Sequence, residues 1–154
     1  MLSIKPHHFI DIITTYGDGV ESFSPHPYGH AVHTVAAHIL DDHDTILVME
    51  LGADDICAPC MHNCDGACVD TIDTSYRPDA PPMKQDWNLI IDHRWCKRLN
   101  IAQGDRLTAR QFCALLRDTD SDLTDIYREM PVHGTVERSR KLFVGVGKIL
   151  GVNE

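Results

Sequence analysis

Four of the six cysteines in this 154-residue chain lie in one short stretch. Cys57, Cys60, Cys64 and Cys68 are spaced C-x2-C-x3-C-x3-C. Thiolates this close together repel one another unless a positive centre binds them, and such short spacings let successive sulfurs turn towards one centre. The spacing therefore predicts a metal centre or an iron–sulfur cluster, with disulfides or free thiols as the alternative.

Two kinds of centre suit four thiolates, a [4Fe–4S] cluster and a tetrahedral zinc ion. Zinc sites more often use two C-x2-C hooks separated by a longer stretch, whereas one compact run wraps more naturally around a cubane. We therefore expect one iron–sulfur cluster, of the [4Fe–4S] type, bound by the four cysteines. The alternative is a structural zinc site with four cysteine ligands, or with three cysteines and one histidine, since His62 lies inside the run.

Two adjacent histidines, His7 and His8, lie where a strand is expected to give way to a helix. Residues 2–5 alternate between apolar and polar, which predicts a short strand, and apolar residues then recur at helical spacing up to Tyr16. Residues 45–51 predict a buried strand that ends just before Asp54, Asp55 and the cysteines. If the two strands pair in parallel, the histidines and the cysteine run meet at the same edge of the sheet.

At that edge His7 and His8 are candidate catalytic residues, as proton donors to a substrate or hydrogen-bond donors to a cluster sulfur. The alternative is that one of them caps the helix or fills a polar corner beside the sheet. For Asp54 and Asp55 we expect a structural role first. They either cap the cysteine run through backbone N–H groups or pair with Lys5 or Arg94.

The rest of the chain predicts mainly helices, at residues 27–40, 83–99, 108–117, 122–130 and 136–150. On the first of these His30 and His33 share one face, with His26 in line if the helix begins that early, and this stripe is either a solvated face or part of a metal site. Cys96 and Cys113 lie beside apolar residues and are expected to pack in the core. No repeat or linker is present, so residues 1–154 are expected to form a single domain. Its predicted class is α+β, mostly helical, with a small sheet of two to three strands and a cysteine-rich metal-binding loop.

Composition narrows the classes of partner and compartment. The formal net charge is −9 and no run of Lys or Arg occurs, which argues against nucleic-acid binding. No apolar run approaches the roughly 20 residues that span a bilayer, so no membrane association is expected. The first residues lack the features of a signal peptide, so we expect a cytoplasmic protein. In a reducing compartment clustered cysteines serve as ligands more often than as disulfides.

Four short motifs resemble one known family. They are Lys5-Pro6-His7-His8, Gly17-x-Gly19 followed by Ser24-Pro25, Asp54-Asp55-Ile56-Cys57, and Gly104-Asp105-x-Leu107-Thr108. Across about residues 4–117 the chain resembles domain-of-unknown-function family 1284, small bacterial and archaeal proteins suspected of binding iron–sulfur clusters. The resemblance implies a metal site and leaves the activity undefined.

The chain departs from that family at two points. Members usually carry Arg where Lys5 stands, and they tend to have a second cysteine cluster near the C-terminus. Here no cysteine follows Cys113. A relative of the family would therefore draw its ligands from the first group, or from Cys96 and Cys113.

Two functional hypotheses follow. In the first, the cluster is closed by four cysteines and the protein is a binding or electron-transfer module with a redox partner protein. In the second, one iron is open to a small-molecule substrate and His7 and His8 handle protons. The sequence carries no nucleophile elbow, phosphate loop or dinucleotide fingerprint, so hydrolase, kinase and dehydrogenase functions have no support.

Overall fold

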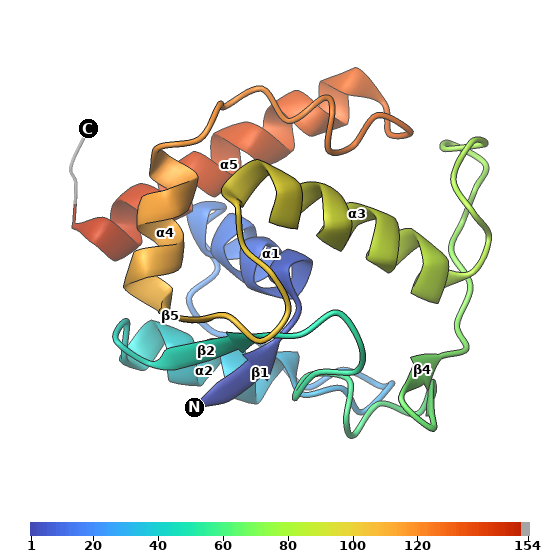
Figure 1. The fold of residues 1–154 in the computed structure, drawn as a ribbon, viewed down its shortest axis with the longest axis horizontal. Helices are drawn as coiled ribbons and strands as arrows, with labels where there is room; N and C mark the ends of the chain where they lie inside the picture. Colours follow the sequence, from blue (N-terminus) through green and yellow to red (C-terminus); the bar gives the residue numbers. More distant parts are fainter. Residues whose placement is uncertain (152–154) are drawn as a thin grey trace.

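Five helices and a three-stranded sheet form the body of the computed structural model, which describes residues 1–151 (Figure 1). The elements run in the order β1 (Leu2–Ile4), α1 (Pro6–Gly17), α2 (Val32–Asp41), β2 (Ile46–Met49), β3 (Asn63–Cys64), β4 (Ala67–Cys68), α3 (Lys84–Leu99), β5 (Arg106–Thr108), α4 (Ala109–Arg117) and α5 (Val132–Leu150). The predicted class, a mostly helical α+β domain with a small sheet, is confirmed.

The sheet has the strand order β1-β2-β5, with β2 in the centre. β1 and β2 run parallel, with Leu2 opposite Leu47 and Ile4 opposite Met49. β5 pairs with β2 in the antiparallel sense. The parallel pairing brings the carboxyl ends of β1 and β2 to one edge, as expected, so that α1 and the cysteine loop both start there.

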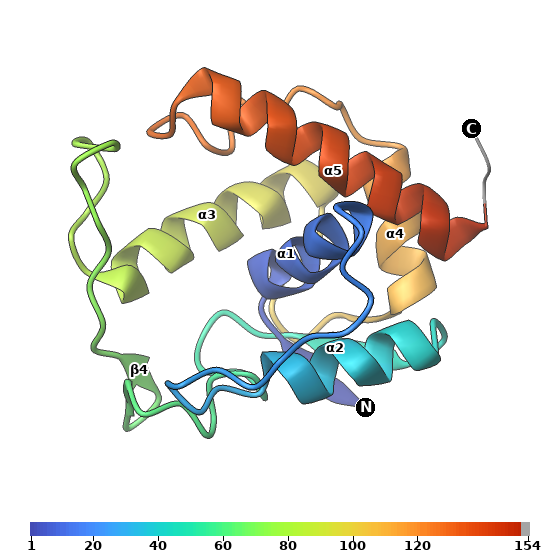
Figure 2. The same ribbon diagram turned by 180° about the vertical axis from the view of Figure 1, so that it is seen from behind.

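Helix α1 is the central element of the core. Phe9, Ile10, Ile12 and Ile13 are buried on it, and the ring of Phe9 stacks on that of Phe112 in α4 with centroids 4.3 Å apart. Seen from behind, α5 runs across α1 on the side away from the sheet (Figure 2). Because α1 is covered on both sides, its first turn, which carries His7 and His8, is held in a fixed position.

Two glycines allow α1 and α5 to touch through their backbones. A Cβ atom on Gly145 would overlap the carbonyl oxygen of Ile13, and one on Gly17 would overlap that of Lys141. Gly145 therefore lies in α5 because only a glycine fits at this crossing. The helix predicted at residues 136–150 is confirmed, and it begins earlier, at Val132.

Two further predicted helices are present and one is absent. The helices at 83–99 and 108–117 are confirmed, and the second opens with a capping box in which Gln111 N donates to Thr108 Oγ1 at 3.0 Å. The helix predicted at 122–130 is wrong, because the segment folds as turns. Thr124 N donates to Asp122 Oδ1 at 3.0 Å, and Arg98 Nη1 donates to the Asp122 carbonyl at 2.7 Å.

The prediction that His26, His30 and His33 share one helix face is also wrong. Helix α2 begins only at Val32, because Gly29 takes a positive φ of 77° that a right-handed helix cannot include. His26 and His30 therefore lie in the loop before α2, where their rings stack with centroids 4.5 Å apart. Of the three predicted members, only His33 is on the helix.

The glycine crossing can be tested with two matched substitutions in α5. We expect Gly145→Ala to lower the free energy of unfolding by about 2–4 kcal/mol, because the added Cβ forces α1 and α5 apart. Gly134→Ala meets no atom within 4 Å and should stabilise the helix by up to about 1 kcal/mol. Urea unfolding measures both values, and equal midpoints for the two variants would contradict the close crossing.

Candidate metal centre

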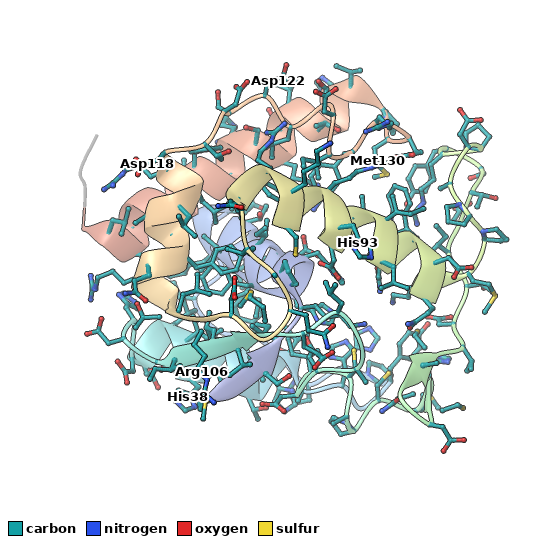
Figure 3. The ribbon with its side chains drawn as sticks, viewed as in Figure 1. His38, His93, Arg106, Asp118, Asp122 and Met130 are labelled. Atoms are coloured by element: carbon teal, nitrogen blue, oxygen red, sulfur yellow. The ribbon has the colours of Figure 1, made fainter. Side chains whose placement is uncertain are left out.

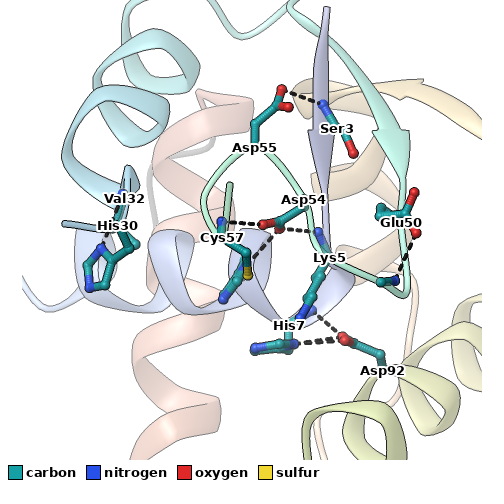
Figure 4. A network of polar contacts seen from close by, with 12 residues as sticks. Ser3, Lys5, His7, His30, Val32, Glu50, Asp54, Asp55, Cys57 and Asp92 are labelled. Carbon is teal, nitrogen blue, oxygen red and sulfur yellow. Dashed lines mark hydrogen bonds and ion pairs between the residues drawn. The ribbon is translucent and has the colours of Figure 1, made fainter. Parts of the chain in front are cut away.

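The carboxylate of Asp54 joins the three segments that meet at the sheet edge (Figure 4). Its Oδ2 accepts hydrogen bonds from Lys5 N and from His8 Nδ1, both at 2.7 Å. Its Oδ1 accepts a third from Cys57 N at 2.9 Å. Asp54 is only 2% exposed, so the end of β1, the first turn of α1 and the start of the cysteine loop share one buried anion.

The protonation states of this pair follow from the contacts. Burial raises the pKa of Asp54, but the hydrogen bonds from His8, Lys5 N and Cys57 N outweigh it and hold the pKa well below its usual range. Burial lowers the pKa of His8, and repulsion from His7 lowers it further. At neutral pH His8 is therefore a neutral imidazole that donates its Nδ1–H to Asp54 and keeps Nε2 as a free base.

His7 has its own buried carboxylate. Its Nδ1 lies 2.9 Å from both oxygens of Asp92 in α3, and its backbone N–H donates to Asp92 Oδ1 at 2.7 Å. Burial alone lowers the pKa of His7, but attraction to Asp92 and the hydrogen bond to it give a net rise. The sequence had placed His7 at this edge but gave no sign of Asp92, which arrives from a helix 85 residues away.

Three of the four clustered cysteines line one small pocket. Cys57, Cys60 and Cys68 share it with Lys5, and it encloses about 20 Å³, room for about one water molecule. Cys64 is exposed outside it, in the β3–β4 hairpin. All six cysteines are free thiols. The structure thus gathers three of the predicted ligands around one pocket and leaves Cys64 at the surface.

The positions of the ligand atoms bear on the kind of metal. Among the described residues, only His8, Asp54 and Cys57 place three His, Cys, Asp or Glu ligand atoms within 4.8 Å of one another. Tetrahedral zinc binds sulfur at about 2.3 Å, which sets its thiolates about 3.8 Å apart. The cysteine sulfurs are not gathered in that way. The group His8, Asp54 and Cys57 was not predicted as a ligand set, although the parallel strands had placed its members together.

Lys5 is the unusual residue of the pocket. It is 2% exposed, and within residues 1–151 its ammonium forms neither a hydrogen bond nor an ion pair. Unlike His62 Nε2, its Nζ is not fully shielded from solvent. Its charge acts on Cys57: burial raises the pKa of that thiol to about 11, Asp54 adds to the rise, and Lys5 opposes it. An anion bound among the three thiols would supply the missing partner.

The remaining predicted residues lie apart from this pocket. Cys113 is fully buried in the core, as expected, and burial raises the pKa of its thiol to about 12. Cys96 is partly buried on α3. The ring of His62 packs edge-on against Tyr28, and its Nε2 is buried without a partner in the described structure. Asp55 caps β1 by accepting from Ser3 N at 2.9 Å rather than capping the cysteine loop.

Comparison with protein-family models, curated proteins and solved structures gives no match for this chain. The resemblance to family 1284 therefore stays a prediction. Separately, none of the helices in residues 1–151 has the length and apolar character needed to cross a membrane.

The His7–Asp92 pair predicts a pH-dependent stability. Because the folded-state pKa of His7 is raised, its contribution is full below the unfolded pKa of about 6.5 and is lost as the pH rises through the folded value. In Asp92→Asn, burial and the charge of Lys5 outweigh the weaker attraction to Asp11, so the pKa of His7 should fall below 6.5. We expect this variant to lose about 1–3 kcal/mol more at about pH 5.5 than at about pH 8.5, measured by urea unfolding.

Asp86→Asn is the matched control, since Asp86 is an exposed carboxylate in the first turn of the same helix. Its effect should be small and equal at both pH values. A loss in Asp92→Asn that is the same at both pH values would contradict an ion pair between His7 and Asp92.

Proposed function

We propose that this protein binds an iron–sulfur cluster through the cysteine loop, with Cys57, Cys60 and Cys68 as ligands. The observation that carries the proposal is the pocket that these three thiols share with the unpaired ammonium of Lys5. A cluster with thiolate ligands carries net negative charge, and a buried lysine beside it offsets that charge. A reducing cytoplasm is the compartment in which such thiols stay free to bind it.

No three cysteine sulfurs among the described residues lie within 4.8 Å of one another, which argues against a single zinc ion bound by cysteines alone. The irons of a cubane stand between the thiolates and hold them farther apart than one zinc ion does. The pocket of about 20 Å³ is smaller than a cubane, so binding requires the β3–β4 hairpin to move outward. That hairpin is suited to such a shift, because Cys64, Asp65, Gly66 and Ala67 at its tip are all exposed.

The position of Cys64 favours a cluster with one iron free of cysteine. With three thiols at the pocket, the fourth iron is open to a small molecule, which is the enzymatic form of the hypothesis. Neutral His8 lies beside Cys57 with Nε2 free, so it is the closer of the two histidines for accepting a proton from such a molecule. The closed, electron-transfer form requires Cys64 to turn inward.

A second candidate is a single divalent ion, such as zinc, held by His8, Asp54 and Cys57. It is favoured by the proximity of these three ligand atoms, which lie within 4.8 Å of one another. Nitrogen, oxygen and sulfur ligands of this kind are those that zinc accepts.

Metal analysis of protein purified without oxygen separates the two candidates. We expect a brown protein with about four irons and four acid-labile sulfides per chain. Among single Cys→Ser variants, those at 57, 60 and 68 should lose the cluster, and Cys64→Ser should keep it. Cys113→Ser is the control, since Cys113 lies in the core away from the pocket.

Other outcomes have defined meanings. Colourless protein with about one zinc per chain, lost on His8→Ala, would replace the cluster with the mononuclear site. Equal loss of iron in all four loop variants would make Cys64 a ligand and the cluster closed. Iron retained in Cys57→Ser would contradict the proposed ligand set.

Lys5→Met tests the charge argument in two opposite directions. In metal-free protein it removes a charge that no carboxylate pairs with among the described residues, so the free energy of unfolding should stay unchanged or rise by up to about 1 kcal/mol. In loaded protein it removes the compensating charge, so the iron retained per chain should fall to roughly half or less. Lys97→Met, at an exposed position on α3, should change neither quantity. A stability loss in metal-free Lys5→Met would contradict an unpaired ammonium.

A further inference from the structure

A second and larger pocket lies beside the first turn of α1. It has a volume of about 440 Å³ and is bounded by His7 and His8, by α3, by residues 71–77, by the turns before α5 and by Arg138 of α5. This volume is in the range of pockets that hold small organic ligands. Neither the cysteine run nor the resemblance to a family points to it.

The charged groups on its wall differ from those of the whole protein. The chain has a net charge of −9, yet this pocket is lined by Arg77, Lys84, Arg138 and the Asp92-paired His7, against two carboxylates, Asp11 and Asp73. Arg138 Nη1 is paired with Asp11 at 2.9 Å, so these two charges cancel. Asp92 offsets the charge of His7, and Asp70 lies 3.7 Å from Lys84 Nζ, so Arg77 is the cation of this wall that no carboxylate pairs with among the described residues. An unpaired guanidinium in a concave site attracts anions even on an acidic protein.

Arg77 is the best placed of these cations. Its Nε donates to the Asp73 carbonyl at 2.7 Å, and its Nη1 lies 3.9 Å from Met130 Sδ. No carboxylate pairs with it among residues 1–151. Lys84 is only weakly engaged, with Nζ 3.7 Å from Asp70 Oδ2. The guanidinium is thus held in orientation and still has donors for an anion.

Apolar and aromatic groups form the rest of the wall. The guanidinium carbon of Arg77 lies 5.4 Å from the centroid of the Trp87 ring. Ile72 and Ile91 line the pocket, and Met130 lies between the turns before α5 and the segment around Arg77 (Figure 3). A ligand here meets a cationic end and an apolar end.

We propose that this pocket binds a small organic anion, with its carboxylate or phosphate group at Arg77 and Lys84 and its apolar part against Trp87. The site is distinct from the cysteine pocket and does not depend on a cluster. The two are nevertheless neighbours, because His8 lines this pocket and donates to Asp54, which in turn accepts from Cys57 N. A ligand bound here is therefore placed beside the candidate metal centre.

The test is isothermal titration calorimetry with three probes of similar shape on the protein as purified. Benzoate and phenyl phosphate carry the two head groups, and benzamide is the neutral control. We expect saturable binding of at least one anion, with benzamide at least about tenfold weaker, as the loss of one charge-assisted hydrogen bond implies. Which anion binds identifies the head group.

Variants assign the binding to this pocket. Arg77→Gln should weaken the anion at least about tenfold, and Arg77→Lys should weaken it less because the charge is kept. Arg128→Gln is the matched control, since Arg128 is exposed outside the pocket and Nε donates to the Asp125 carbonyl. Circular dichroism confirms that each variant is folded.

Three results would overturn the proposal. They are the absence of saturable binding for both anions, benzamide binding as tightly as the anions, and an equal effect of Arg77→Gln and Arg128→Gln. Because the titration needs no metal, repeating it on Cys57→Ser protein separates it from the cluster. If Cys57→Ser protein still binds the anion and no preparation contains a cluster, the anion site is supported and only the proposed iron–sulfur function is contradicted.

Discussion

The buried carboxylate of Asp54 is the contact on which the arrangement of the candidate centre depends. It accepts from Lys5 N, from His8 Nδ1 and from Cys57 N, which belong to three segments that come together only in the folded chain. An anion buried in this way is stable only while its donors stay in place. The position of the cysteine loop relative to the sheet is therefore tied to the position of the first turn of α1.

Both histidines are held by a hydrogen bond to a buried carboxylate, but their pKa values shift in opposite directions. Each gives Nδ1 to a buried carboxylate, His7 to Asp92 and His8 to Asp54, so each has Nε2 available. Their rings are adjacent, with centroids 4.3 Å apart, and the charge of His7 disfavours a second charge on His8. The pKa of His7 is raised and that of His8 is lowered, so the two adjacent imidazoles hold a proton with different strengths.

Local patterns in the sequence were sufficient to predict which residues meet at the edge of the sheet. The apolar run before Gly52 and the alternation in residues 2–5 predicted the parallel pair, and from it the approach of His8, Asp54 and Cys57. The capping box at Thr108 was equally local. The helix predicted at 122–130 does not form, because the Asp122 side chain accepts hydrogen bonds from Thr124 N and Thr124 Oγ1 and so stabilises a turn. The spacing of apolar residues carries no information about such local hydrogen bonds.

The features that could not be predicted from the sequence depend on tertiary contacts. Nothing near Asp92 marks it as the partner of His7, since the pairing depends on where α3 packs. Likewise, the spacing of the four cysteines could not tell that Cys64 would be turned outward at the hairpin, because the C-x3-C intervals on either side of it are identical. The wall of the larger pocket is formed by α1, α3, the 71–77 segment and α5, so no single stretch of sequence predicts it.

The glycine-mediated crossing of α1 and α5 has a consequence for synthesis on the ribosome. Helix α1 is synthesised well before α5, the helix that covers its outer side. Until α5 has emerged, the apolar face of α1 has no cover, and the first turn with its histidines lacks a rigid support. The cysteine loop also precedes α5 in the chain, so the arrangement that Asp54 organises gains its full support only after α5 has been synthesised.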